Sequence, residues 1–497
     1  MCIESSVRYC RMTQRIILEP HPRHALVQSR VTGLHSPPRL PLLMTLVNAL
    51  PGAATPSDDP MSSNSAVASR AWPNLLAAFM GLLLVLTPAN NKVAGLAYVV
   101  VLFVAAWAYW RVPALDAPRG AGLRHAARFW LGVCAAAVAV RYAVAMVWGD
   151  SLGDRHFEMR LLLAALAVYV LLNRLFFSAA QKSWLLHALA MALCVAFGIA
   201  FVYSRVTPTN PIPWAAAMSF LTCVLMATAL QDGSDKWARL SAIVGAIAGV
   251  GAVILSQSRG SYGIVAWACL VGGWALVRWL GTPSASGRFW HRTWTKVWLP
   301  SAVLVCLVAV LVSVPRFYME PVARLQEAWN DVKVLRTASA TGQPPAAAIA
   351  TSVGVRLYMW QMAMVEIKKA PVLGHSRAER IEWVQSLGKV SGAEAFGGLA
   401  HLHSDPLNAW FDHGLPGLLS YLGLAFGLAW VAWRYAARGS ALRLGLAGLV
   451  FMHISSGLTN MNTGHNYYGV VLSLSIALTW LLSRSGAPPS RTSVANG

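Results

Sequence analysis

The segments G-V-R-L-Y-M-W (Gly354–Trp360), G-H-S-R (Gly374–Arg377) and H-L-H-S-D-P-L-N (His401–Asn408) belong to one long stretch between residues 315 and 410. This stretch is too polar to sit in a lipid bilayer, whereas repeated apolar runs precede and follow it. Each run approaches the ~20 residues that a membrane-spanning helix requires. We therefore expect a membrane protein organised around one large loop outside the bilayer.

The composition supports this interpretation. The chain has 497 residues, of which 56% are hydrophobic and only 12% are charged, whereas about a quarter of the residues of a soluble protein are charged. The predicted fold class is an all-α polytopic membrane protein. A soluble protein with unusually apolar helices is the alternative, and it would not require so many apolar runs of spanning length.

We count about twelve spanning helices in the apolar runs. Their approximate ranges are 72–88, 93–110, 129–148, 160–177, 184–203, 213–230, 239–256, 261–280, 296–314, 413–433, 441–459 and 467–483. The predicted organisation is a disordered cytoplasmic tail (1–70), spanning helices 1–9 (71–314), the large loop (315–410), spanning helices 10–12 (411–484) and a cytoplasmic C-terminal tail (485–497). Met61 offers a second translation start just before the first span.

Basic residues set the expected orientation. The net charge is +21, and arginines and lysines gather in the short connections 111–128, 278–296 and 434–443. All three connections follow even-numbered spans, so the positive-inside rule places them in the cytoplasm and the 315–410 loop on the outer side. The basic residues form no recognised nucleic-acid-binding module, so no nucleic-acid partner is expected.

Cysteine usage excludes a disulfide framework in the loop. The seven cysteines are Cys2, Cys10, Cys134, Cys194, Cys223, Cys269 and Cys306, and none lies between residues 315 and 410. Packing and the membrane must therefore hold this loop in place.

The loop itself has a predicted internal structure. Residues 320–336 place Val322, Leu325, Trp329, Val332 and Leu335 on one helical stripe, which could lie on the membrane or pack on the loop. Residues 337–351 are typical of a flexible linker, and a second helix is expected from Val353 to Pro371. Asp405 and Pro406 have the pattern of an N-cap and first helical residue leading into the tenth span.

Two histidines come directly before that helix start. His401 and His403 could be incidental members of a polar loop, or an imidazole could act as a general base. A metal site would need a third ligand, since H-x-H alone specifies little. No paired carboxylates stand on the outer side, so no metal or other cofactor is expected.

Arginines indicate a negatively charged ligand. S-Q-S-R-G-S-Y (Ser256–Tyr262) joins the seventh and eighth spans on the outer side, and Arg356 begins a loop helix on the same side. Guanidinium groups bind phosphate oxygens in pairs, which suits a diphosphate on a lipid carrier. Each arginine could instead be a residue that snorkels to the membrane interface. That second interpretation is favoured for the outward-facing residues near span ends, which are Arg141, Arg155, Arg160 and Arg205.

In its motifs the chain resembles the O-antigen ligase and polymerase superfamily of bacterial membrane proteins. The resemblance rests on S-R-G after a mid-chain span, on G-V-R-x-x-x-W in a large outer loop, and on H-x-H before a helix that contains G-L-P-G-L-L (Gly414–Leu419). It covers roughly residues 72–485. Ser404 and Pro406 stand where the family usually has an asparagine and an aromatic residue.

The resemblance implies a GT-C-like glycosyltransferase of the bacterial inner membrane whose active site faces the periplasm. It implies His403 as catalytic base and Arg259 and Arg356 as contacts of an undecaprenyl-diphosphate-linked donor. The transfer would be metal-independent and inverting, and the expected acceptor is lipid A-core. The secondary candidates are His401, His375, Arg377, Arg160, Arg155, Arg141, Arg205 and Tyr262.

Other functions stay open on the sequence alone. An O-antigen polymerase or a protein O-oligosaccharyltransferase would use the same donor with another acceptor. A multispan transporter would also be apolar and basic, although transporters more typically show related halves or interrupted helices at mid-membrane. The polar residues of this chain gather at the outer surface instead.

Overall fold

The structure is a computed structural model, and it describes residues 91–112, 117–150, 156–175, 177–203, 210–231, 235–280, 315–341, 351–391, 396, 398–465 and 468–483. All of these belong to one compact unit, residues 63–497. The expected tails, the spans at 72–88 and 296–314, and most of the linker at 337–351 lie outside the described residues.

The described part of the chain is helical and contains no strand. In chain order its α-helices are α4 (Asn91–Arg111), α5 (Ala117–Val147), α6 (His156–Arg174), α7 (Ala179–Tyr203), α8 (Pro211–Ala229), α9 (Lys236–Leu255), α10 (Gly263–Leu280), α13 (Pro315–Thr341), α15 (Ser352–Ile367), α16 (Arg377–Ser391), α17 (Asp405–Tyr435), α18 (Ala441–Thr459) and α19 (Tyr468–Ser483). Two short 3-10 helices follow α9 and α18: η3 (Arg259–Ser261) and η6 (Asn462–Gly464).

Six described helices are long and apolar enough to cross a membrane. They are Gly122–Val147 within α5, then α7, α8, α9, α17 and α18. Tyr98–Arg111 and Tyr468–Ser483 are shorter apolar helices. Together these helices suggest a multi-pass membrane protein, in agreement with the predicted all-α class, whereas the count of twelve stays a prediction.

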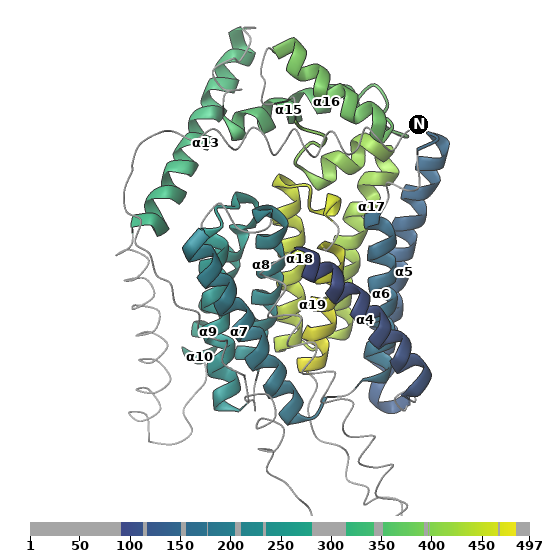
Figure 1. The fold of residues 1–497 in the computed structure, drawn as a ribbon, viewed down its shortest axis with the longest axis vertical. Coiled ribbons are helices and arrows are strands. Elements are labelled where there is room, and N and C mark those ends of the chain that lie inside the picture. Colours follow the sequence, from purple (N-terminus) through teal and green to yellow (C-terminus); the bar gives the residue numbers. More distant parts are fainter. Residues whose placement is uncertain are drawn as a thin grey trace, which may run out of the picture. The chain divides into compact units, whose positions relative to one another are not determined.

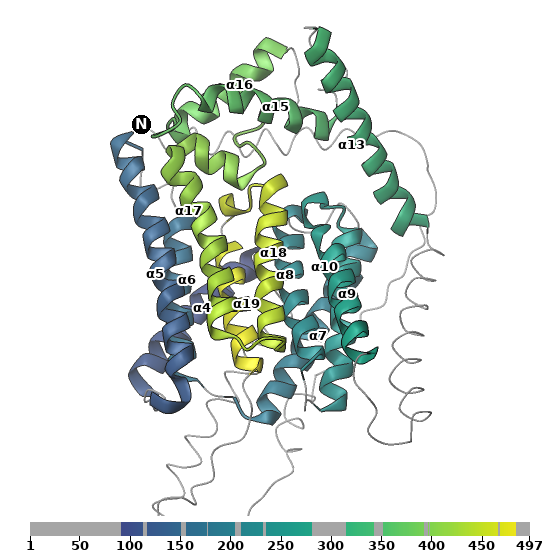
Figure 2. The ribbon, with the colours of Figure 1, turned by 180° about the vertical axis from the view of Figure 1, so that it is seen from behind.

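Helix α8 forms the centre of the bundle. Every residue from Pro213 to Thr228 is buried, which is the expected environment for a helix that is apolar on all sides. It packs against α9, α18 and α19 (Figures 1 and 2). Helix α17 packs against α5 and α18, so the second half of the chain closes onto the first.

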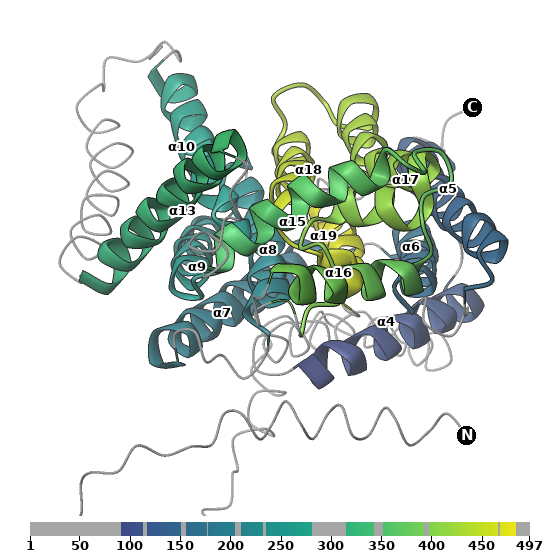
Figure 3. The ribbon, with the colours of Figure 1, turned by 90° about the horizontal axis from the view of Figure 1, so that it is seen from above.

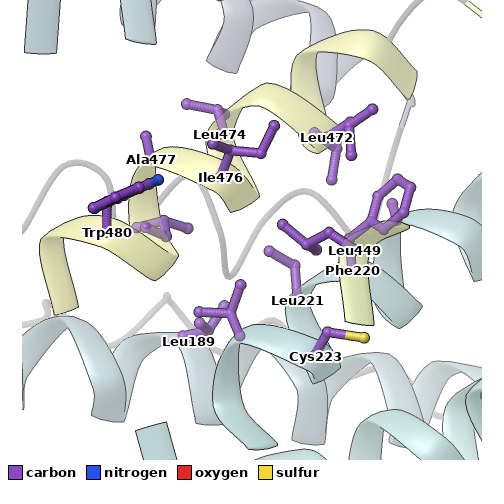
Figure 4. Packing of buried hydrophobic residues seen from close by; sticks show 14 of the residues in the cluster. Leu189, Phe220, Leu221, Cys223, Leu449, Leu472, Leu474, Ile476, Ala477 and Trp480 are labelled. Atoms are coloured by element: carbon purple, nitrogen blue, oxygen red, sulfur yellow. The ribbon is translucent and has the colours of Figure 1, made fainter. Parts of the chain in front are cut away.

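Side chains from four helices interlock in this core. Figure 4 shows Leu189 of α7 near Leu221 of α8, with Leu449 of α18 beside Phe220 of α8. Phe220 also contacts Tyr468 at the start of α19, with ring centroids 5.4 Å apart. Apolar packing of α8 against α18 and α19 therefore positions the segment that follows α18.

The large loop forms its own layer over one end of the bundle. Helices α13, α15 and α16 lie together there in Figures 1 and 3, and α15 contacts both α13 and α17. A small apolar core holds this layer, built around Met359, Ala363, Val384 and Phe411. Helix α16 was not predicted from the sequence.

The residues of the predicted stripe on the first loop helix differ in exposure. Trp329 and Val322 are 62% and 48% exposed, whereas Leu335 is buried together with Asp331. Helix α13 packs on α15, and the carboxylate of Asp331 accepts a hydrogen bond from the hydroxyl of Thr351, the N-cap residue of α15, at 2.5 Å. The apolar spacing thus predicted a helix, and whether its exposed apolar side chains lie on a membrane stays a prediction.

Two glycines let the loop cross α17 at short distance. Gly374 and Gly414 have φ angles of +70° and +60°, which a glycine adopts without steric cost. A Cβ at Gly414 would lie 2.0 Å from the Val372 oxygen, and one at Gly374 would lie 2.5 Å from the Phe411 oxygen. Here α17 departs from helical geometry, so the expected start of the tenth span at 413 is a kink inside a longer helix.

Candidate functional site

Hydrogen bonds between side chains and backbone atoms hold the H-x-H segment before α17. The Trp360 indole donates to the Leu402 oxygen at 2.6 Å, and the Leu402 nitrogen donates to Asn408 Oδ1 at 3.2 Å. The Arg380 guanidinium donates to the Ala400 oxygen. Three different helices thus hold Ala400 and Leu402, the residues on either side of His401.

A buried ion pair supports these contacts. Arg380 donates to the two oxygens of Asp412 at 2.5 and 3.1 Å, and Asn408 Nδ2 also donates to Asp412 at 3.3 Å. Arg380 is 1% exposed and Asp412 is 5% exposed. A buried pair of this kind is costly to break on one side, because the remaining charge is left unpaired.

The two halves of the site share an unusual backbone geometry. His403 and Gln257 have φ angles of +50° and +55°, and they are the non-glycine residues with positive φ in the described part of the chain. Such conformations cost energy and cluster at functional sites. Gln257 lies two residues before Arg259, so the strain marks both the histidine segment and the S-R-G segment.

The histidines are partly buried, and their pKa values are lowered. The rings of His401 and His403 lie 4.1 Å apart, nearly perpendicular. Burial, followed by the nearby His401 and Arg356, lowers the pKa of His403 to about 2. Burial likewise lowers the pKa values of His401 and of His465 to about 4 each. A neutral imidazole can accept a proton, which is the form that a general base needs.

His465 was missed by the sequence analysis. It follows η6 and lies close enough to influence the pKa values of both His401 and His403. No motif connects it with H-x-H, since His465 follows His403 by 62 positions in the chain and only the fold brings the two residues together.

The guanidinium group of Arg356 lies near His403 and near that of Arg259. Burial lowers the pKa of Arg356, and the positive charge of Arg259 lowers it further. Arg356 donates to the Thr459 oxygen at 3.3 Å, while Arg259 pairs with Glu327 of α13 at 3.2 Å. Two partly buried cations that repel each other form a favourable place for a ligand with two negative charges.

The carboxylate of Asp405 ties the segment after α18 to the start of α17. It accepts hydrogen bonds from the backbone nitrogens of Asn462 and Thr463 and from the Thr463 hydroxyl, at 2.5–3.2 Å. The N-cap residue of α17 is Ser404, one residue earlier than predicted. Asp405 is thus the first residue of α17, and its carboxylate fixes the 460–465 segment instead of capping its own helix.

The secondary candidates occupy other positions. His375 stacks on Phe411 with ring centroids 4.8 Å apart and pairs with Glu379, and the Arg377 nitrogen donates to Asp150 at 3.4 Å. His375 and Arg377 thus belong to the contact between the loop and the bundle.

The remaining candidates contact other parts of the helix bundle or lie outside the described residues. Arg141 donates to the Ser420 hydroxyl at 2.7 Å between α5 and α17, and the Tyr262 hydroxyl donates to the Ile254 oxygen at 3.5 Å. Arg160 lies near Tyr98 of α4. Arg155 and Arg205 lie outside the described residues. The part of the chain that the structure describes contains no group of three metal-ligating side chains.

Comparison with known proteins agrees with the motifs. Residues 243–422 match the model of a family described as O-antigen ligase. A curated relative, an O-antigen ligase of Escherichia coli strain K12, is 30% identical over 152 residues, which are 29% of this chain and 34% of that protein. The chain thus matches about a third of the relative's length. The matched family segment includes Arg259, Arg356 and His403 and ends before Thr459.

Proposed function

We propose that this chain, which matches the O-antigen ligase family model over residues 243–422, transfers a glycan from undecaprenyl diphosphate to lipid A-core at the outer face of the bacterial inner membrane. The family implies an enzyme of glycosyl transfer, while the donor, the acceptor and the orientation are parts of the proposal. One observation carries it: the fold brings His403, Arg356 and Arg259 together from three separate segments of the chain.

The proposed reaction is a single displacement. A sugar hydroxyl of the acceptor attacks C1 of the donor's first sugar, so that a new C1–O bond forms as the bond between C1 and the diphosphate oxygen breaks. The bonding electron pair leaves with the lipid diphosphate, and the hydroxyl proton goes to His403. Attack from the side opposite the leaving group inverts C1.

The charges at the site suit separate roles for the arginines and for His403. Arg356 and Arg259 would stabilise the charge that develops on the departing diphosphate. Before the donor binds, burial and Arg356 keep His403 unprotonated. A bound diphosphate would offset these positive charges, which raises the pKa of His403 and makes it a stronger base when it is needed.

The test is complementation. The chain is produced in a bacterial strain that lacks its own ligase but makes the lipid-linked glycan and lipid A-core. Glycan attached to lipid A-core is the expected result. Longer glycan on the lipid carrier without transfer to the core would contradict the ligase function and indicate a polymerase.

A matched histidine pair sharpens this test. His403→Ala should abolish attachment, whereas His375→Ala replaces an imidazole of the same loop that packs on Phe411 and should retain it. Purified protein should also work in excess EDTA if guanidinium groups replace a divalent cation. Activity lost to EDTA and restored by magnesium would overturn this mechanism.

A further inference from the structure

Buried polar atoms without a protein partner gather beside the two arginines. Among the described residues, this set includes Ser258 Oγ, Arg259 Nη1, Ser261 Oγ, Thr459 Oγ1 and Asn460 Nδ2. Asn460 is 2% exposed, Ser258 is 5% exposed and Ser261 is fully buried. Buried polar atoms are normally hydrogen-bonded within a protein, so a local concentration of unpaired ones requires an explanation.

The missing side chain of Gly260 makes room for two of these groups. A Cβ at residue 260 would lie 2.0 Å from Asn460 Nδ2 and 2.5 Å from Thr459 Oγ1. The fold therefore accommodates the Asn460 amide and the Thr459 hydroxyl against η3 and yet gives neither of these two atoms a bond to the protein.

The backbone of the same two residues touches both halves of the site. The Thr459 oxygen accepts a hydrogen bond from Arg356 at 3.3 Å, and the Asn460 oxygen accepts one from the Asp405 nitrogen at 3.1 Å. The backbone is thus fixed between the arginines and the start of α17, while the side-chain donors stay unused. An amide NH₂ can only donate, so its ligand must accept hydrogen bonds.

We propose that Asn460 and Thr459, together with Ser258 and Ser261, form an uncharged half of the diphosphate site. This inference rests on the proposed function, and residues 459 and 460 lie beyond the segment that matches the family model. Arg259 and Arg356 offset the two charges of a diphosphate diester. The amide and hydroxyl groups donate to the phosphate oxygens that the guanidinium groups leave without a partner.

Uncharged donors suit the leaving group for a second reason. Breaking the bond from C1 adds a negative charge to the diphosphate, and donors already in place stabilise that charge without reorganising. They also do so without adding a third cation to two that already repel each other.

The test measures binding of a polyprenyl diphosphate and a polyprenyl monophosphate, both without glycan, to the purified full chain. Asn460→Asp keeps the size of the side chain but replaces the donor with a carboxyl group, and Thr459→Val removes only the hydroxyl. We expect diphosphate binding about 10- to 100-fold weaker for Asn460→Asp and about 10-fold weaker for Thr459→Val, because hydrogen bonds to charged groups are strong. Monophosphate binding should change less, so the preference for diphosphate falls.

Asn173→Asp is the matched control. Asn173 is a buried asparagine near the end of α6, where its amide donates to the Tyr169 oxygen. This variant tests for a general effect of a carboxyl group at a buried amide position and should keep the preference for diphosphate. Should Asn460→Asp fail to fold, Thr459→Val alone decides, because its shape and its backbone contact with Arg356 are unchanged.

The outcomes separate this inference from the proposed function. If Arg356→Met loses diphosphate binding while Asn460→Asp and Thr459→Val keep the wild-type preference, the uncharged half-site is wrong and the function stands. If the wild-type chain shows no preference for diphosphate over monophosphate, both the function and the inference are overturned.

Discussion

The histidine segment and the arginine pair are held in different ways. The backbone before His403 is fixed by Trp360, Asn408 and the buried Arg380. Arg259, in contrast, pairs with a carboxylate of α13 that is about one-third exposed. A buried network specifies one geometry, whereas a partly exposed ion pair is weak and replaceable. If His403 is the base, as proposed, it is therefore in place before substrate binds, while the proposed anion site would exchange the Glu327 carboxylate for the diphosphate.

The largest expected effect comes from removing the base. His403→Ala should reduce transfer about 10²- to 10⁴-fold, the usual contribution of a general base, and should leave donor affinity near that of the wild type. The measurements are transfer to lipid A-core and donor binding to purified protein. Near-normal transfer would remove His403 as the base and make His401 or His465 the next candidate.

Changes to the arginines should affect both binding and turnover. Arg356→Met and Arg259→Met would remove the proposed diphosphate contacts, which act before and during bond breaking, so the donor Kd should rise and kcat should fall. We expect the donor Kd to rise about 10- to 100-fold for each variant. Arg→Lys at either position should restore binding only partly, because an ammonium group cannot reproduce the planar fork of a guanidinium group. Full recovery of donor binding with lysine would indicate general electrostatic attraction of the diphosphate and not hydrogen bonds of fixed geometry.

Loosening the histidine segment should lower turnover with little effect on donor binding. Arg380→Met breaks the buried pair and leaves the Asp412 carboxylate unpaired, at a cost of about 3–5 kcal/mol in stability. Arg380→Met with Asp412→Leu should regain much of this stability but not the turnover, because the Ala400 oxygen still lacks its donor. Thermal unfolding and kcat separate the two effects, and a double variant with restored kcat would exclude the positioning role.

Removing the negative charge of Glu327, which pairs with Arg259, should slightly increase donor affinity. Glu327→Gln keeps the size of the side chain and removes the charge that pairs with Arg259. Donor affinity should increase a few-fold, because exposed or partly exposed ion pairs contribute about 0–1 kcal/mol. Glu366→Gln is the control, since Glu366 pairs with the exposed Lys369 elsewhere in the loop. Weaker donor binding by Glu327→Gln would mean that Glu327 assists the ligand instead of competing with it.

The smallest expected effect is a shift in pH dependence. A cation near His403 disfavours protonation, so the acidic limb of kcat/KM should lie well below pH 6.5 in the wild type. Arg356→Met removes one such cation, which raises the pKa of His403 and moves the limb to higher pH. Profiles measured for both proteins check the direction, and a limb that stays in place would show that Arg356 does not act on the base.

The sequence predicted the helices that depend on local signals. The span predicted at 441–459 coincides with α18, whose start is capped by the Ser440 hydroxyl. The start of α17 was displaced by one residue because Ser, Asp and Pro all favour a helix N-terminus, and the carboxylate of Asp405 turned out to bond elsewhere.

The candidate site was only partly predictable from the sequence, because some of its residues stand in recognisable motifs and others are brought to it only by tertiary contacts. Arg259, Arg356 and His403 stand in short motifs with unusual polarity for their surroundings. Asn460 becomes notable only through its contact with Gly260, 200 residues earlier in the chain, and such a contact has no local signature. Arg380 was missed for the same reason, since its partner Asp412 lies on another helix.

The left-handed backbone of His403 restricts which amino acids can replace it. At a φ of +50° a β-branched side chain would be strained, whereas asparagine tolerates this conformation better than most residues. Few single substitutions at this position can therefore keep the turn intact. His403→Asn separates loss of the imidazole from loss of the turn more cleanly than His403→Ala, and evolutionary drift at residue 403 should be confined to the same few amino acids.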